Sequence, residues 1–446
     1  MNVVLMLFIV TGLAGVLFWG MFSLSSLIEK KSRASLTGML FLIVFSIAWF
    51  GGLITFHPND YILAGAIILI AVPALLFFLP VGKSKAMKIT AITEKVDERD
   101  TMFAREEYQT GTEKYNAYYT MRPGNKQIDD KIRSLPELLA PGGRYYDPLR
   151  SGYIASMFKF EERHTTHVDG PVNSVRQNVD PAEMSRILKK SALHLGADEA
   201  GIARLNPYYV YSHVGRGPET WGTEIRNTHP YVIAFTVEMD YTRVGKAPGI
   251  GISEETALQY LNAQKISITL AQYIRDLGYS ARAHVSGSNY QIMLPPVAYD
   301  AGLGELGRLG YLISPRFGAR IRLGAVTTDI PLVPGKPIEF GVQDFCEKCK
   351  KCAVNCPSGA IPSGGKTMVR GVEKWQLNIE KCFPYWRIIG TDCGLCMKVC
   401  PFSHPDIFIH NVLRAGIKRS SFARSVSVYG DELFYGEKAK FPEFLE

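Results

Sequence analysis

Three long uncharged segments at the start of the chain constrain its architecture more than any other feature. They cover residues 3–28, 34–56 and 61–82. Each exceeds the roughly 20 residues that an α-helix needs to cross the hydrocarbon core of a bilayer. Buried helices of a soluble domain are the alternative, but three such runs separated only by short polar loops favour a transmembrane anchor over residues 1–82.

Basic residues in the loops predict how this anchor is oriented. They follow the first and the third run, whereas the loop at residues 57–60 has no lysine or arginine. The positive-inside rule therefore places the rest of the chain on the cytoplasmic side of the inner membrane, next to membrane lipid. The basic residues are Lys30, Lys31, Arg33, Lys83, Lys85 and Lys88.

The remaining chain has the patterns of an α+β protein. Residues 83–149 are polar and rich in tyrosine, and we expect an extended, partly helical linker there. In residues 150–340, residues 182–195 have helical periodicity, residues 232–237 are typical of a buried strand, and residues 254–277 form a long helix ended by glycine. This alternation predicts an α/β or α+β core. A net charge of +8 without a basic stripe or binding motif argues against a nucleic-acid partner.

All eight cysteines lie between residues 346 and 400, in one local module at residues 341–405. The first four have x2, x2, x3 spacing and a proline follows the fourth, which is the pattern of two-cluster ferredoxins. Structural zinc is the alternative, but zinc sites pair two CxxC units and do not produce this run. The crossed ligand pattern of such ferredoxins predicts two 4Fe-4S clusters. The expected sets are Cys346, Cys349, Cys352 and Cys400 for one cluster, and Cys356, Cys382, Cys393 and Cys396 for the other.

A glycine motif precedes the cysteine module. Gly302, Gly304 and Gly307 fit the dinucleotide-binding expression, which also requires a preceding strand and a following helix. The flanking residues do not match that context, so a nicotinamide site is disfavoured. We expect these glycines to allow close approach of a flat cofactor or of a neighbouring helix.

Several strings in the chain resemble the corrinoid iron–sulfur reductases. They are VDERDTMFAR at residues 96–105, Leu277-Gly278-Tyr279, DAGLGELGRLGYLISPRFGARIRL at 300–323 and KCFPYWRIIGTDCGLCMKVC at 381–400. The chain is most similar to the catalytic subunit of reductive dehalogenases, and epoxyqueuosine reductase is a more distant relative. The resemblance covers residues 95–405.

This resemblance implies cofactors and a fold. A cobalamin-type corrinoid is expected in a nitroreductase-like α/β core at residues 150–340, bound base-off, with Gly302, Gly304, Gly307 and Arg322 among the cofactor-binding residues. The chain has no D-x-H-x-x-G string, so no histidine is nominated as a cobalt ligand. One cluster is expected close to cobalt and the other as an electron relay. Residues 406–446 are expected to form a C-terminal extension that packs on the core.

The resemblance also implies a catalytic acid, which is a tyrosine near the start of the long helix. By position this residue is Tyr260, with Arg320 of the Phe-Gly-x-Arg element as its cationic partner and Arg322 as the alternative. A guanidinium within about 4 to 6 Å of a phenol stabilises the phenolate. Asn289 is a candidate for holding the phenol, and Ser288 or Ser286 could take that role instead. The simpler interpretation is that Tyr260 is one of 22 tyrosines in the chain and only happens to lie on an amphipathic helix.

The expected function is replacement of halide by hydrogen on a small organohalide. The alternatives are a corrinoid reductase that acts on an epoxide or another reducible group, and a membrane-tethered iron–sulfur protein that only transfers electrons. Typical respiratory members carry a twin-arginine leader and dock on a separate anchor protein, whose place the three helices are expected to take here. The electron donor stays open between ferredoxin or flavodoxin and a quinol, and so does homo-oligomer formation.

Overall fold

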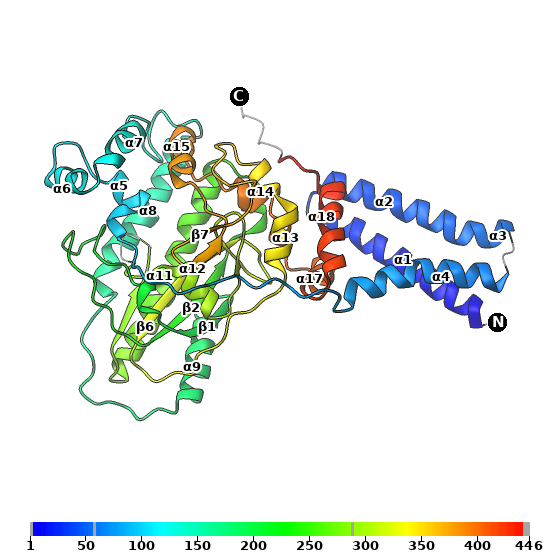
Figure 1. The fold of residues 1–446 in the computed structure, drawn as a ribbon, viewed down its shortest axis with the longest axis horizontal. Coiled ribbons are helices and arrows are strands. Elements are labelled where there is room, and N and C mark those ends of the chain that lie inside the picture. The colour runs from blue at the N-terminus through cyan, green and yellow to red at the C-terminus, as the bar shows by residue number, and fades with distance from the viewer. Residues whose placement is uncertain (1–2, 57–58, 287–289, 440–446) are drawn as a thin grey trace. The chain divides into compact units, whose positions relative to one another are not determined.

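The computed structural model describes residues 3–56, 59–286 and 290–439, and its contacts divide the chain into two units (Figure 1). We call them the helical unit, with residues 1–86, 339–349 and 405–439, and the core unit, with residues 87–338 and 350–404. Residues 440–446 fall outside the described part. Each unit is described separately below.

The helical unit contains three helices that are long and apolar enough to cross a membrane. The first is α1 (Val3–Ile28), and the third is α4 (Asp60–Phe78). The second is continuous through α2 (Ser32–Ser46), a π-helical segment η1 (Ile47–Gly51) and α3 (Gly52–Phe56). The three predicted helices are thus present. The third ends at Phe78, earlier than the uncharged run, because the backbone turns extended at Leu79 before a proline.

Close packing between α1 and the second helix depends on a tryptophan. The Trp49 ring stacks on Phe8 with centroids 4.3 Å apart, and its Nε1 donates to the Phe8 carbonyl at 3.0 Å. A Cβ atom at Gly12 would collide with the same indole ring. Small residues and interhelical hydrogen bonds of this kind are what hold helices together where no hydrophobic effect acts between them.

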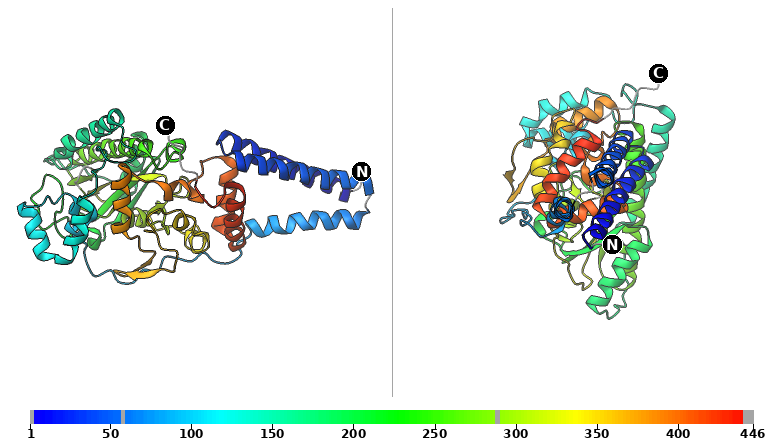
Figure 2. Two further views of the ribbon diagram at one scale, coloured as in Figure 1. Left: turned by 90° about the horizontal axis from the view of Figure 1, so that it is seen from above. Right: turned by 90° about the vertical axis from the view of Figure 1, so that its right-hand side faces the viewer.

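Two C-terminal helices, α17 (Phe408–Arg419) and α18 (Ser421–Tyr435), lie at one end of the apolar helices (Figures 1 and 2). The Ser420 hydroxyl donates to the Leu76 carbonyl at 2.6 Å, and the Phe434 ring packs on Phe22 of α1. The sequence predicts that this extension covers the core. The structure groups residues 405–439 with the apolar helices, and their apolar side chains contact α1 and α2. Packing of the extension on the core stays a prediction.

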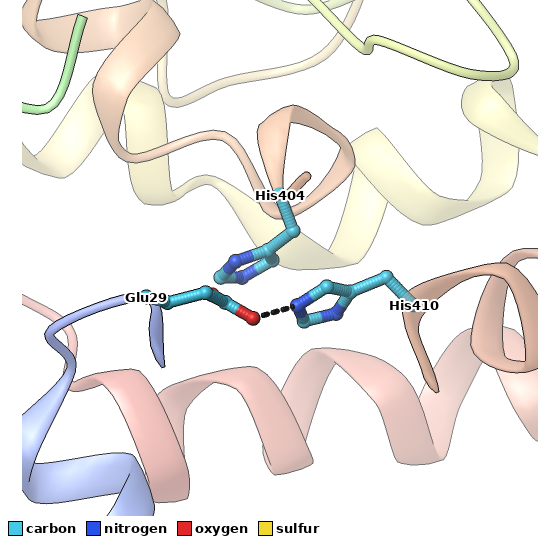
Figure 3. A group of neighbouring side chains, drawn as sticks. All are labelled: Glu29, His404 and His410. Atoms are coloured by element: carbon cyan, nitrogen blue, oxygen red, sulfur yellow. Dashed lines mark hydrogen bonds and ion pairs between the residues drawn. The ribbon is translucent and has the colours of Figure 1, made fainter. Parts of the chain in front are cut away.

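A buried ion pair joins α17 to the end of α1. His410 Nε2 lies 2.7 Å from Glu29 Oε1, and both side chains are only 3% exposed (Figure 3). The Tyr435 ring lies beside the imidazole. Removing one partner leaves the other buried polar group without its hydrogen bond, which costs about 1 to 3 kcal/mol. The pair therefore fixes the position of α17 on α1.

The helix α13 (Val342–Cys349), which carries Cys346 and Cys349, also belongs to the helical unit. Asp344 accepts the backbone N–H of Lys85 at 2.9 Å and pairs with Arg424 of α18 at 3.5 Å. Arg424 is 1% exposed and also donates to the carbonyls of residues 82 and 83. The segment that leaves α4 is thus fastened to a cysteine-bearing helix.

The core unit is built on a four-stranded antiparallel sheet in the order β1-β2-β6-β3. Its strands are β1 (Glu199–Arg204), β2 (Tyr231–Glu238), β6 (Ile321–Thr328) and β3 (Ala281–His284). The strand predicted from sequence at 232–237 is present as β2, which forms the centre of the sheet together with β6.

Helices cover both faces of this sheet. Alternate residues of β2, among them Ile233 and Phe235, pack against α9 (Pro181–His194) and α11 (Ile250–Asp276). The intervening residues, Val232 and Ala234, pack against α12 (Leu294–Asp300) on the other face. Because side chains of a strand alternate between the two faces of the sheet, both faces are apolar and each is covered by helices, which gives three layers. The predicted mixed helix and strand core is thus confirmed. The helix α8 (Pro148–His164) packs on α11.

The rest of the core unit consists of short elements. Residues 87–147 of the core unit contain short helices joined by irregular segments. The elements of this linker and of the cysteine module are α5 (Met102–Glu106), α6 (Glu113–Met121), α7 (Pro123–Arg133), α14 (Lys351–Val354), α15 (Ile379–Ile389) and α16 (Leu395–Lys398). The remaining helix is α10 (Tyr241–Val244), and two hairpins pair β4 (Glu305–Leu306) with β5 (Leu312–Ile313) and β7 (Thr367–Val369) with β8 (Val372–Lys374).

Candidate functional site

Two cavities of the core unit share one wall. We call the first, of about 150 Å³, the cysteine cavity, and the second, of about 250 Å³, the tyrosine cavity. Four side chains line both of them and form the shared wall: Tyr260, Tyr311, Arg322 and Met397. The tyrosine chosen from sequence as the catalytic acid thus lies between the two cavities.

The cysteine cavity is lined by four cysteines from separate elements. Cys356 follows α14, Cys382 lies in α15, and Cys393 and Cys396 lie at the start of α16. These are the four residues of one predicted cluster set, which the fold brings together from a 41-residue stretch of chain, 356 to 396. None of the eight cysteines forms a disulfide bond.

The environment of these thiols suits an iron–sulfur cluster. Burial raises the pKa of Cys382 to about 11 and that of Cys393 to about 12, and in both cases neighbouring cysteines add to the effect. Burial also raises the pKa of Cys396 well above its ordinary value. Thiolates in such a place are stable when metal ions neutralise them, so four convergent sulfur donors fit a 4Fe-4S cluster.

The second cluster set is divided between the two units. Cys346 and Cys349 lie on α13 of the helical unit, and Cys352 and Cys400 belong to the core unit. Their grouping around one cluster stays a prediction from the spacing.

Arg322 is the cationic residue that lies against Tyr260. Its guanidinium carbon is 5.2 Å from the centroid of the Tyr260 ring. Its Nη2 donates to the Thr256 hydroxyl at 2.8 Å, and Thr256 lies one turn before Tyr260 on α11. Contact between α11 and β6 brings the two side chains together. The geometry is that of a cation over the face of a phenol ring.

Neighbouring acidic groups favour the positively charged form of Arg322. Burial alone would lower the pKa of Arg322. Electrostatic attraction to Tyr260 and Asp392 has the opposite and larger effect, so the pKa of Arg322 is raised. Burial raises the pKa of Asp392, and the nearby Arg322 opposes that change. Asp392 is held by the Ser253 hydroxyl, which accepts from its backbone N–H at 2.9 Å. Sequence reasoning missed Asp392, although its place directly before Cys393 was visible.

Arg320 has a different place from the one predicted. It is fully buried, donates to the Ser403 carbonyl at 2.6 Å and pairs with Glu238 at 2.7 Å. Its guanidinium also lies over Tyr241, and Arg320 lines neither cavity. The prediction that it partners Tyr260 is therefore corrected to Arg322. The physical reason is that Arg320 lies in the turn before β6, where two backbone carbonyls and Glu238 bind its Nε and Nη1.

An Arg320→Met variant should therefore lose stability without losing the chemistry of the cavities. Removing the cation leaves two carbonyls and Glu238 without their donor, which should lower the free energy of unfolding by about 3 kcal/mol. Thermal unfolding of the purified protein, with iron content as a second readout, measures this effect. Exposed Arg316 supplies the matched control, because Arg316→Met should leave the midpoint nearly unchanged. An unchanged midpoint in Arg320→Met would contradict the structural role.

The three motif glycines serve internal packing. A Cβ atom at Gly302, whose φ is +78°, would lie 2.6 Å from the Lys336 carbonyl oxygen. Gly304 and Gly307 lie against Ile313 of the β4–β5 hairpin. None of the three lines either cavity. The three glycines therefore allow close approach of Lys336 and Ile313, and not of the side chains shared by the two cavities. Leu309 and Tyr311, between the motif and β5, do line the cavities.

The candidates near residue 288 are only partly described. Asn289 and Ser288 lie outside the described residues. Ser286 is described, and its hydroxyl donates to Glu161 of α8. Tyr290 lines the tyrosine cavity together with Tyr211, and sequence reasoning had not ranked either residue as part of the site.

Comparisons with known proteins agree with this architecture. A family model described as a 4Fe-4S dicluster domain matches residues 345–404. The tetrachloroethene reductive dehalogenase of Sulfurospirillum multivorans is 34% identical over 321 residues, which cover 64% of each chain. That of Desulfitobacterium hafniense is 32% identical over 296 residues, or 54% of this chain and 53% of the relative. Epoxyqueuosine reductase of Bacillus cereus is 34% identical over 135 residues, covering 25% of this chain and 31% of the relative.

Solved structures give the same result. One titled "Reductive dehalogenase structure suggests a mechanism for B12-dependent dehalogenation" matches with a TM-score of 0.63 and 26% identity, over 81% of this chain and 49% of that chain. The catabolic reductive dehalogenase NpRdhA, as a K488Q variant, matches with a TM-score of 0.65 and 25% identity, over the same shares. The chain thus spans about half to two thirds of the length of these relatives. By sequence and by fold, the chain is similar to reductive dehalogenases over this shared part, and it is similar to epoxyqueuosine reductase over a shorter stretch.

Proposed function

We propose that this protein is a membrane-anchored, corrinoid- and iron–sulfur-dependent reductase that replaces halide by hydrogen on an organohalide. One observation carries the proposal: Tyr260 and Arg322 form the wall between a cavity lined by four cysteines and a second cavity lined by apolar and aromatic residues. The first cavity suits electron delivery, and the second suits an apolar substrate beside a flat cofactor.

The lining of the tyrosine cavity fits a corrinoid. It is largely aliphatic and aromatic, with Ile292, Leu294 and Leu323 among the lining residues, and Arg322 is the one charged residue among the described ones. Arg322 Nε is buried and has no hydrogen-bond partner within the described residues, so a donor is left for a bound group. No histidine is among the described residues that line this cavity, which agrees with base-off binding. When bound, the corrinoid supplies the two-electron reductant for carbon–halogen cleavage. A nitroreductase-like form of this core is part of the proposal, and the helices on both faces of its sheet are compatible with it.

Tyr260 supplies the proton in this proposal. Carbon–halogen reduction consumes two electrons and one proton and releases halide. The phenol of Tyr260 gives its proton to carbon, and Arg322, over the face of the ring, stabilises the phenolate that remains. The cysteine module delivers the electrons from a ferredoxin, a flavodoxin or a quinol.

The proposal is tested by reconstituting the full chain and measuring corrinoid content and halide release. Protein that contains about one corrinoid and releases bromide or chloride from a panel of halophenols and haloethenes supports it. The similarity to epoxyqueuosine reductase supports a second candidate, a corrinoid reductase of an epoxide. Bound corrinoid with reduction of an epoxide and no halide release would favour that candidate. Iron–sulfur absorbance without corrinoid would favour a protein that only transfers electrons.

The location of the protein is proposed from its three apolar helices and the basic loops beside them. We expect the core unit on the cytoplasmic side of the inner membrane, because both basic loops lie on that side. A reporter active only outside the membrane, fused after residue 446, should therefore be silent. A cytoplasmic reporter at the same position should be active. The reverse pattern would place the core unit outside.

A further inference from the structure

A buried carboxyl group near the tyrosine cavity has no role in the chemistry described so far. Glu161 of α8 is fully buried, and its Oε2 accepts a hydrogen bond from the Ser286 hydroxyl. Its Oε1 is buried and has no hydrogen-bond partner among the described residues. Burying a carboxylate without a cation or full hydrogen bonding is costly, so a group in this place favours its protonated form. The unpartnered oxygen is the natural place for that proton.

Two hydrogen bonds tie Glu161 to the elements that carry the cavity tyrosines. Gln264 lies one turn after Tyr260 on the same face of α11. Its side-chain amide donates to the backbone carbonyl of Glu161 at 2.7 Å. From the other side, Ser286 follows β3 and precedes Tyr290, which lines the tyrosine cavity together with Tyr260. Glu161 is thus fixed by α11 and by the segment after β3, and these two elements carry the two cavity tyrosines.

The pKa values of Glu161 and Tyr290 are both shifted by their surroundings. Burial raises the pKa of Glu161 to about 7, the Ser286 hydrogen bond opposes this, and the charge of Glu162 adds to it. Burial also raises the pKa of Tyr290 well above its ordinary value, and the charges of Tyr260 and Glu161 raise it further. No lysine or arginine is among the groups that act on Glu161, although Arg216 and Arg322 act on Tyr290. Tyr290 is therefore within electrostatic range of both Tyr260 and Glu161.

We propose that Glu161 is the proton reservoir that restores Tyr260 after each turnover, with the hydroxyl of Tyr290 as the relay between them. The proposal rests on the proposed function and extends it. After Tyr260 gives its proton to the product, its phenolate takes a proton from the Tyr290 hydroxyl, and Tyr290 takes one from the Glu161 carboxyl. The carboxylate then regains a proton from water. One proton enters per turnover and no electrons move along this path.

The relay makes a specific kinetic prediction. In Glu161→Gln, Tyr260 still holds its own proton, so the first turnover should proceed at the normal rate. Later turnovers should slow by about 10²-fold, because the phenolate has lost its supply. The same separation of first and later turnovers is expected in Tyr290→Phe. Exposed Glu162, the next residue on α8, gives the matched control, since Glu162→Gln makes the same side-chain exchange outside the relay and should leave both phases unchanged.

The pH profile distinguishes a relay from a structural role. Glu161 loses its proton as the pH rises through about 7, so steady-state turnover of the wild type should fall above that pH. This fall should be absent in Glu161→Gln and kept, at a shifted position, in Glu161→Asp. Equal slowing of the first and later turnovers in Glu161→Gln, or no slowing at all, would overturn the relay.

An infrared titration gives a readout that does not need activity. The full-length protein should show the carbonyl stretch of a protonated carboxyl that disappears as the pH rises through about 7, and this band should be missing in Glu161→Gln. Absence of that band in the wild type would also overturn the proposal. If the wild type shows the band but releases no halide in even a first turnover, the proposed function has failed. A normal first turnover in every variant, with no later slowing, is the failure of the relay alone.

Discussion

A Tyr260→Phe variant should lose about 10²- to 10⁴-fold in turnover while it keeps its cofactors, because the substitution removes only the acidic proton. The ring would still lie under Arg322, whose guanidinium carbon is 5.2 Å from the ring centroid, so the wall between the two cavities stays filled. The loss should appear already in the first turnover, which separates this residue from Glu161. Halide release in single-turnover and steady-state assays, with corrinoid and iron content measured on the same samples, gives the test.

A tyrosine on the same helix serves as the control for this variant. Tyr273 of α11 is 37% exposed and lines neither cavity, so Tyr273→Phe should keep full turnover. Full turnover in Tyr260→Phe would remove Tyr260 from the mechanism. Loss of corrinoid or iron in Tyr260→Phe would instead assign it a binding role.

Replacing Cys396 by serine should remove one complete cluster, or about four of eight irons. Cys396 lines the cysteine cavity with three other cysteines, and a hydroxyl is a poor substitute for a thiolate ligand of iron. Without the cluster beside the shared wall, electrons no longer reach the tyrosine cavity, so turnover should be lost as well. Iron analysis and the spectrum of the reduced protein measure the effect.

Double variants test the assignment of cysteines to sets. A Cys393→Ser and Cys396→Ser double variant should lose no more iron than either single variant, because both residues serve the same cavity. A Cys346→Ser and Cys396→Ser double variant should lose about eight irons, because the spacing assigns these residues to different clusters. Equal iron loss in the two double variants would contradict the crossed sets.

The sequence predicts those parts of the molecule whose signals are local. Length and lack of charge predict the apolar helices, and a run of apolar residues predicts β2. The spacing of the cysteines predicts which four line the cysteine cavity, because a cluster requires its ligands at fixed separations along the chain. The apolar helices, β2 and this cysteine set each follow from a pattern within one stretch of sequence, and the structure contains all three.

The features that depend on tertiary contacts could not be predicted in the same way. Arg320 and Arg322 are two residues apart, and only the start of β6 decides that Arg322 lies against Tyr260. Glu161 is about a hundred residues from Tyr260 in the chain, and the packing of α8 on α11 brings them together. The glycine motif is ambiguous for the same reason, because the approach of Gly302 to the backbone at Lys336 is a tertiary contact.

The attachment of α13 to the segment after α4 has a practical consequence for work with detergents or shortened chains. A chain that begins at residue 87 would lack Lys85, whose backbone N–H and ammonium group bind Asp344 and Glu347 of α13. It would also lack the backbone carbonyls of residues 82 and 83, to which Arg424 donates hydrogen bonds. In a soluble fragment made in this way, the helix that carries Cys346 and Cys349 would therefore lack the contacts that hold it in position. For this protein, removing the anchor is expected to damage the metal-binding capacity of the remaining enzyme and not only its location.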